Sequence, residues 1–193
     1  VENGRLEPTV LGGGTPVGIC GTGIIDALAI MLDNGVVRGN GAFDRAAAEA
    51  SPVFSGRIET QNGTTACLLG DGIAITQKDI RNIQLARGAS LAAARILLRD
   101  AAYEAERIEH VLVAGAFGEN LDIENFRALG FLPDFPNARY RFLGNTSLAA
   151  AERACVDPGF LGMCRALRDA IHVVELSMRA DFNDEFVDCL NFG

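Results

Sequence analysis

The chain has 193 residues, with 17 Lys and Arg against 25 Asp and Glu, and 49% of its residues are hydrophobic. This is the composition of a globular protein, long enough for one domain to bury about 70% of the surface that its unfolded chain exposes. The net charge of −8 leaves no basic surface for phosphates, so we expect no nucleic-acid partner. Because no apolar run reaches the roughly 20 residues of a membrane span, and the first residues lack a signal-peptide pattern, we expect a cytoplasmic protein with no membrane partner.

The five cysteines and two histidines show no metal-binding spacing. The cysteines are odd in number, scattered and without a C-x-x-C pair, which favours reduced thiols over disulfides, zinc or an iron–sulfur cluster. His110 is expected at a strand edge and His172 on a helix surface. No nucleophile with its base and no pair of carboxylates is evident. We therefore assign neither metal ligands nor catalytic residues to this chain.

The first segment that indicates a ligand is rich in glycine and leads into a helix. Glycines at 12–14, 18, 21 and 23 precede an apolar stripe with helical spacing. Glycines let the backbone approach a ligand, and the free N–H groups of a first helical turn suit a phosphate. Neither the dinucleotide pattern nor the P-loop pattern is satisfied. Two interpretations stay open, a phosphate contact through Gly21, Thr22 and Gly23 or a closely packed helix entry.

From Val36 to Thr76 the apolar pattern alternates every second residue. Residues 57–60 and 65–69 flank Asn62-Gly63, and Asp71-Gly72 precedes a third run at 73–76. Because these pairs tolerate positive φ, they are typical of tight turns. The pattern predicts a small three-stranded meander inserted between helices.

A long helix is predicted next, because Thr76 and Asp79 form a capping-box pattern and an apolar stripe continues to about Ala102. Lys78, Arg81, Gln84 and Arg87 lie together on another face of this helix, at spacings of three and four. We favour a solvated face over the alternative, a row of donors laid along a ligand.

Two strands then each end in a glycine turn. Residues 110–113 precede Gly115-Ala116-Phe117-Gly118, with Asp122 as a helix cap and Gly130 as the left-handed end of that helix, and residues 139–143 precede Gly144-Asn145 and a further helix. In an open α/β sheet, ligands bind at the carboxyl ends of the strands. We expect two last helices, one opened by Asp157-Pro158 and continuing to about His172, the other near 181–190.

This order of elements resembles the second lobe of an actin-like ATPase domain, in the superfamily of sugar kinases, heat-shock chaperones and actin. The resemblance implies an α/β, ribonuclease-H-like fold in which the turn at Gly115–Gly118 contacts adenosine and Gln84 and Arg87 contribute from the long helix. Gly115-Ala116 stands where the superfamily often has adjacent glycines. The superfamily's Asp-x-Gly-Thr phosphate motif has no match here, so catalytic residues would lie upstream of Val1.

A closer resemblance, spanning about Pro16 to Phe192, is to the C-terminal domain of reductive activators of corrinoid proteins. Four motifs carry it in the same order: residues 18–26, residues 76–87, residues 114–122, and Glu175-Leu176-Ser177 before Phe182 and Phe186. It implies that residues 1–193 are the C-terminal lobe, with residues 36–76 as an inserted subdomain. A ferredoxin domain holding a [2Fe-2S] cluster and the first ATPase lobe would be absent from this chain. The intact protein would use ATP with Mg²⁺ to return an inactivated Co(II) corrinoid protein, its methyl-transfer partner, to Co(I).

We expect the following residues to bind nucleotide: Gly21, Thr22, Gly23, Lys78, Gln84, Arg87, Gly115, Ala116, Phe117, Gly118, Gly144 and Asn145. The intact protein is expected to be an ATPase coupled to electron transfer, and this chain alone to be inactive. Two alternatives stay open, half of a small-molecule kinase of the same superfamily or a non-catalytic interaction lobe. A homodimer is also left open.

Overall fold

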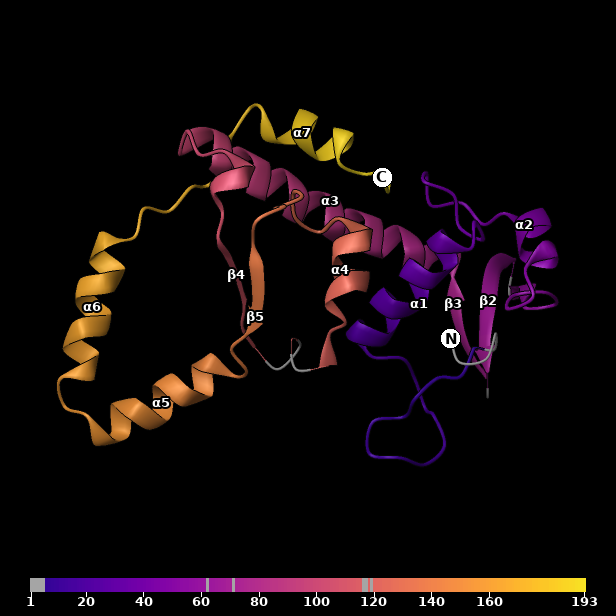
Figure 1. Cartoon of the computed structure of the whole chain (residues 1–193), viewed down its shortest axis with the longest axis horizontal. Coiled ribbons are helices and arrows are strands. Elements are labelled where there is room, and N and C mark those ends of the chain that lie inside the picture. Colours follow the sequence, from indigo (N-terminus) through magenta and orange to yellow (C-terminus); the bar gives the residue numbers. More distant parts are fainter. Residues whose placement is uncertain (1–5, 62, 71, 116–117, 119) are drawn as a thin grey trace.

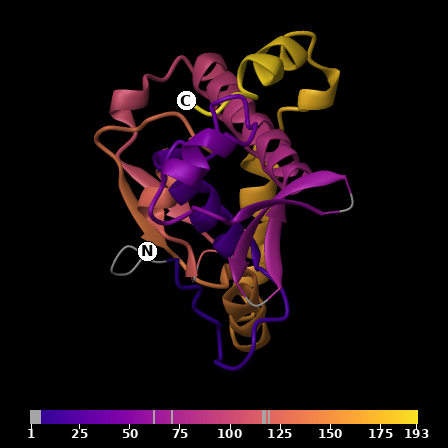
Figure 2. The same ribbon diagram turned by 90° about the vertical axis from the view of Figure 1, so that its right-hand side faces the viewer.

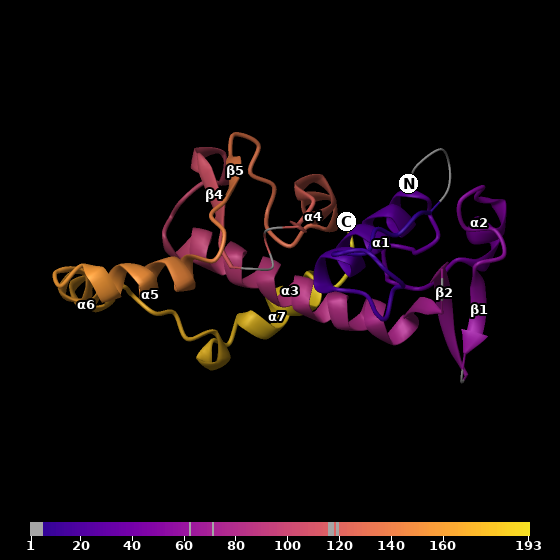
Figure 3. The ribbon, with the colours of Figure 1, turned by 90° about the horizontal axis from the view of Figure 1, so that it is seen from below.

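The computed structural model describes residues 6–61, 63–70, 72–115, 118 and 120–193. A long helix, α3 (Gln77–Asp100), runs along the middle of the molecule, as Figures 1 and 3 show. Its 24 residues span about 36 Å. An antiparallel meander lies near its start and a parallel strand pair near its end, so α3 connects the two parts of the chain that carry strands.

The meander consists of β1 (Ile58–Gln61), β2 (Thr64–Gly70) and β3 (Ile73–Thr76), paired antiparallel in the order β1-β2-β3. This confirms the alternating pattern as a three-stranded meander. Asn62 and Asp71, each one residue of an expected turn, lie outside the described residues. A short helix, α2 (Arg45–Ala50), precedes the strands and was not predicted, because its six residues are too few for a clear helical period. Figure 2, viewed from this end, shows the strands against the start of α3.

The parallel pair consists of β4 (His110–Val113) and β5 (Arg139–Phe142), with His110 opposite Arg139 and Val113 opposite Phe142. Between them the chain forms α4 (Ile123–Leu129), whose cap at Asp122 and left-handed Gly130 are both confirmed. Helix α1 (Gly21–Asp33) packs against α4. Parallel strands joined through a helix place both strand ends and their glycine turns at the same edge of the sheet.

The core lies between α1, the meander, α3 and α4. Its fully buried side chains include Leu28 and Met31 of α1, Phe54 before the meander, Ile80 of α3 and Leu129 of α4. The capping box at the start of α3 is confirmed: the Asp79 backbone N–H donates to Thr76 Oγ1 at 3.2 Å, and the Thr76 N–H donates back to Asp79 Oδ2 at 2.9 Å.

The C-terminal region forms two helices that stand apart and one that returns to the body. Helices α5 (Thr146–Val156) and α6 (Phe160–Ala170) contribute no buried residue, whereas α7 (Phe182–Asp188) packs on α3 through Phe182 and Phe186. Short 3₁₀ turns occur at Ala105–Arg107 and Leu176–Met178. Asp157 ends α5 instead of opening α6, which begins at Phe160 without a side-chain cap, so that prediction was wrong. Among the described residues, no helix is both long and apolar enough to cross a membrane.

Candidate functional site

The two strand-end turns are joined to each other. The Gly115 backbone N–H donates to the Gly144 carbonyl at 2.8 Å, and the Leu143 N–H donates to the Val113 carbonyl at 2.9 Å. Gly115 has φ +104° and Gly144 has φ +67°, values that residues with a Cβ adopt only with strain. Glycine is therefore required at both turns, and the hydrogen bond holds them side by side at the carboxyl ends of β4 and β5.

Gly118 is buried at the base of this pair of turns. A Cβ there would lie 3.0 Å from Val113 Cγ1 and 3.1 Å from Phe142 Cδ1. A larger residue at this position would therefore have to displace the Val113 or Phe142 side chain. Asn145 follows the second turn and caps α5, because its Oδ1 accepts from the Leu148 N–H at 3.1 Å. Ala116 and Phe117, which were expected to contact the nucleotide, lie outside the described residues.

The glycine-rich entry forms the N-terminus of α1. Cys20 is the N-cap residue: its Sγ accepts from the Gly23 N–H at 3.4 Å and lies 3.1 Å from Thr22 Oγ1. These hydrogen bonds, that of Thr22 first, stabilise the thiolate and lower the pKa of Cys20. Thr22 is buried, and Gly21 is exposed at the tip of the helix.

A cavity of about 730 Å³ lies beside this helix entry. More than half of its lining residues belong to the segment 6–19, which contributes Glu7, Thr9 and Thr15. The other polar lining residues are Cys20, Thr22 and Asp26 on the α1 side and Asn120 and Asn125 on the α4 side. Asn125 Nδ2 donates to Asp26 Oδ1 at 2.8 Å and so ties α4 to α1 across the cavity edge. The helix entry and the segment that follows Gly118 thus share one cavity, and no Lys or Arg is among its described lining residues.

Gln84 and Arg87 lie elsewhere, in a buried contact with the C-terminal segment. Their exposed fractions are 1% and 5%. Arg87 donates from Nε to the Leu129 carbonyl at 2.8 Å and from Nη1 to the Cys189 and Asn191 carbonyls at 2.5 and 2.7 Å. Gln84 Nε2 donates to the Leu190 carbonyl at 3.2 Å. Burial lowers the pKa of Arg87, a group whose ordinary pKa is far above neutrality, so it stays charged.

The favoured expectation of a solvated face is wrong for these two residues, although Lys78 and Arg81 are exposed as expected. The polar groups of Gln84 and Arg87 hold the chain end against α3. Leu129, whose carbonyl accepts from Arg87, ends α4, whereas the turn at Gly115–Gly118 precedes α4. The seven residues of α4 span about 10 Å. A nucleotide contact by Lys78, Gln84 or Arg87 stays a prediction, and for Gln84 and Arg87 it requires release of these carbonyls.

The structure thus brings some of the expected residues together and separates others. Gly115, Gly118, Gly144 and Asn145 form one cluster at the strand ends. The α1 entry lines the cavity together with Asp26 and two asparagines that the sequence did not single out as ligand contacts, whereas none of the four cluster residues is among the lining residues. Asn120, two residues beyond Gly118, carried a usable signal, because polar residues that follow a strand-end turn often face a ligand.

Comparison with known proteins agrees with this arrangement. The family match and the superposition given below place the fold in the class of actin-like (ASKHA) domains. Residues 2–193 match the family described as the C-terminal domain of RACo, the ASKHA domain. The chain belongs to this family.

Two relatives and one solved structure show how much of a longer protein the chain corresponds to. It is 28% identical over 201 residues to the corrinoid activation enzyme RamQ of Eubacterium limosum, covering 100% of this chain and 34% of RamQ. It is 34% identical over 141 residues to the [Co(II) methylated amine-specific corrinoid protein] reductase of Methanosarcina barkeri, covering 73% of this chain and 22% of that protein. A solved reductive activator for corrinoid, iron-sulfur protein superposes with a TM-score of 0.83 at 31% identity, covering 94% of this chain and 29% of that one. The chain therefore spans about a third or less of each.

Proposed function

We propose that the chain is the nucleotide-binding C-terminal part of an ATP-dependent reductive activator, which returns an inactivated Co(II) corrinoid protein to Co(I). The observation that carries this proposal is the family match over residues 2–193. The hydrogen-bonded turns at Gly115 and Gly144 support it, since they lie at the carboxyl ends of parallel strands, where α/β folds bind nucleotides.

The geometry fits an adenine nucleotide with a divalent cation better than a free polyanion. The strand-end turns would face the adenosine, and the N-terminus of α1, where the Gly23 N–H already donates to Cys20 Sγ, would face the phosphates. Because no described Lys or Arg lines the cavity, Mg²⁺ would supply the positive charge that the phosphates need. Asp26, whose Oδ1 is held by Asn125, is the carboxylate nearest to this helix entry in sequence.

An iron–sulfur cluster does not fit the described residues. No three His, Cys, Asp or Glu side chains come together there in a way that could hold a metal. We therefore assign the electron carrier to the part of a family-length protein that this chain does not cover. We derive no electron-transfer step from the residues of this chain.

In this account the role of the chain is to close on the nucleotide. A ligand shifts a conformational equilibrium only when it binds one state more tightly than the other. The Asp26–Asn125 hydrogen bond connects the α1 entry to the segment behind the Gly115 turn, so a nucleotide that contacts both would favour the arrangement in which this bond is formed. Closure would then change how the whole activator binds its corrinoid partner.

The test uses a polypeptide of family length that ends in this chain, a one-electron donor, ATP and a Co(II) corrinoid protein. We expect ATP-dependent appearance of the Co(I) absorption spectrum, with ATP hydrolysed to ADP and phosphate. Gly118→Val should abolish it, because the added side chain collides with Val113 and Phe142. Gly162→Val is the matched control, since nothing lies within 4 Å of a Cβ there. Reduction that is independent of ATP would refute the proposal, and so would ATP-dependent phosphorylation of a small metabolite without corrinoid reduction.

A further inference from the structure

Asp26 brings a negative charge to the cavity beside α1, and no cation of the described chain pairs with it. The side chain is half-buried and lines the cavity, where Asn125 Nδ2 donates to its Oδ1 at 2.8 Å. None of the ion pairs between described residues includes Asp26, and no Lys or Arg is among the described lining residues. A carboxylate that is partly withdrawn from water is stabilised by a cation. The cavity therefore favours a ligand that brings positive charge.

The position of Asp26 on α1 places its carboxylate towards the start of the helix. Residues 22, 23, 26, 27 and 30 line the cavity and share one helical face. Asp26 is four residues beyond Thr22, about 6 Å along the axis, and helical side chains lean towards the N-terminus. The carboxylate thus leans back towards the end of α1 that the proposed function assigns to the phosphates. Two neighbouring anionic groups repel each other unless a cation lies between them.

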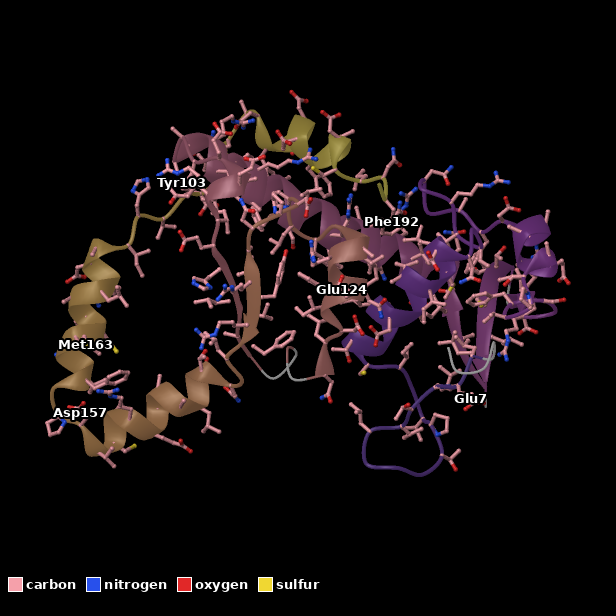
Figure 4. All side chains as sticks on the ribbon, in the orientation of Figure 1. Glu7, Tyr103, Glu124, Asp157, Met163 and Phe192 are labelled. Carbon is pink, nitrogen blue, oxygen red and sulfur yellow. The ribbon has the colours of Figure 1, made fainter. Side chains whose placement is uncertain are left out.

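The chemistry of the lining fits Mg²⁺ that is also held by a bound phosphate. Mg²⁺ prefers oxygen atoms, and proteins usually hold it through one or two carboxylates together with substrate phosphates. The cavity offers the carboxylates of Asp26 and Glu7 and the hydroxyls of Thr9 and Thr15. Figure 4 shows the segment with the labelled Glu7 beside the meander and below α1. Because the described residues form no group of three His, Cys, Asp or Glu that could hold a metal, phosphate oxygens have to complete the set of ligands.

We propose that Asp26 is the carboxylate that interacts with the Mg²⁺ of a metal–nucleotide complex, and that Asn125 is the positioning residue that orients it. This inference rests on the proposed nucleotide function. The Asn125 amide donates to Oδ1 from α4, and Oδ2 accepts no hydrogen bond from the described residues. Because the amide is neutral, it fixes the direction of the carboxylate and leaves its charge available to a cation. A Lys or Arg in the place of Asn125 would neutralise that charge.

Calorimetric titration of the 193-residue chain with ADP, once in excess Mg²⁺ and once in EDTA, tests the role of Asp26. Asp26→Asn keeps an oxygen that accepts from Asn125 but removes the charge. The dissociation constant of Mg·ADP should rise at least about fivefold, because the cation loses its carboxylate. The dissociation constant of ADP in EDTA should fall, because the bare phosphates lose a repelling neighbour. Asp33→Asn is the matched control on the same helix, since Asp33 is exposed and not among the lining residues, and it should change neither value.

The role of Asn125 is tested with Asn125→Ala in the same two titrations. We expect a weaker affinity for Mg·ADP by at least about threefold and a smaller difference between the Mg²⁺ and EDTA titrations, because Asp26 is no longer held by a charge-assisted hydrogen bond. Asn137→Ala is the matched control. Its Nδ2 donates to the Glu106 carbonyl at the same 2.8 Å, outside the cavity, and its loss should leave both titrations unchanged. Circular dichroism should show that all four variants are folded.

The outcomes separate this inference from the function on which it rests. If the parent chain binds Mg·ADP and Asp26→Asn changes both dissociation constants in the same direction, or neither, Asp26 does not face the cation and this inference fails alone. If Asn125→Ala binds as the parent does, Asn125 is not a positioning residue. If the parent chain binds ADP in neither titration, the proposed nucleotide function fails and this inference fails with it.

Discussion

At the scale of single residues, Arg87 is a polar side chain that the sequence suggested as a nucleotide contact, but in the structure it hydrogen-bonds backbone carbonyls. Its guanidinium reaches carbonyls of the α4 end and of the C-terminal segment, and its carbon lies 5.9 Å from the centre of the Phe192 ring. The sequence predicted the helix and the spacing of Arg87 correctly. It could not predict the partners, because they lie 42 to 104 residues away in the chain.

We therefore expect Arg87→Ala to lower the free energy of unfolding by roughly 2–4 kcal/mol, since three carbonyls, two of them in buried hydrogen bonds, lose a charged donor. Urea denaturation of the variant measures this loss. Arg165→Ala is the control, because Arg165 is exposed and has no ion-pair partner in the described part of the chain, and it should change stability by less than about 0.5 kcal/mol. Equal stability of the two variants would contradict the role that we assign to Arg87.

Cys20 provides a second prediction at this scale. Hydrogen bonds from Thr22 and the Gly23 N–H lower its pKa, whereas burial raises the pKa of Cys67 to about 11. Because the thiolate is the reactive form, iodoacetamide at pH 7 should alkylate Cys20 before Cys155, which is also exposed, and long before Cys67. Peptide mass spectrometry against time measures this order. Thr22→Val should slow the alkylation of Cys20 and leave the alkylation of Cys155 unchanged. An unaltered alkylation rate at Cys20 would show that the Thr22 hydrogen bond does not lower its pKa.

At the scale of elements, the docking of α7 on α3 depends on charge as well as on two phenylalanines. Asp181 accepts from Arg179 Nε at 2.9 Å and from Arg99 Nη2 at 2.6 Å, and Arg179 also pairs with Asp100 of α3. The hydrogen bonds of Arg179 lower the pKa of Asp181 from 3.8 to about 2. A group with a depressed folded-state pKa stabilises the fold above its unfolded pKa, and this contribution is lost as the pH falls towards 2.

The thermal midpoint of the chain should therefore fall more steeply between pH 4 and pH 2 than that of Asp181→Asn, which lacks the titrating carboxylate. Circular dichroism melts at half-unit pH steps measure the difference. Asp184→Asn, on α7 and exposed, is the control, and its thermal midpoint should change with pH as that of the parent chain does. Parallel pH profiles for the parent and Asp181→Asn would contradict the contribution of this ion pair.

The elements also show what sequence patterns can and cannot predict. The capping box at Thr76, the cap at Asp122 and the left-handed Gly130 were predictable because each depends on side chains within a few residues. The end of α5 was not, since Asp157 accepts from Arg153 one turn before it instead of opening the next helix. The sequence predicted two strands that each end in a glycine turn, but not that the two turns lie side by side. The hydrogen bond between them and the Asp26–Asn125 contact depend on tertiary structure.

At the scale of the whole molecule, the chain is a scaffold with two uncovered regions. One is the cavity lined by residues 6–19, the α1 entry, Asn120 and Asn125, and the other is the pair of helices α5 and α6, which have no buried residue. The sequence predicted the α/β class and the inserted meander, and the family match confirms the resemblance to corrinoid activators. The sequence could not show that α5 and α6 are exposed, because an apolar helical stripe has the same pattern whether it is buried or exposed.

The central claim is that the glycine turns and the α1 entry bind an adenine nucleotide, and an amide NMR titration of the 193-residue chain with Mg·ADP tests it most directly. We expect saturable shifts of amide resonances, confined to Gly115, Gly118, Gly144, Asn145 and the first turn of α1. The amide resonance of Gly162 in α6 is the internal control and should not shift. The Gly118→Ala chain should show these shifts only at higher Mg·ADP concentrations, because the added methyl group crowds the Val113 and Phe142 side chains. An absence of shifts at millimolar Mg·ADP, or shifts confined to other parts of the chain, would contradict the account.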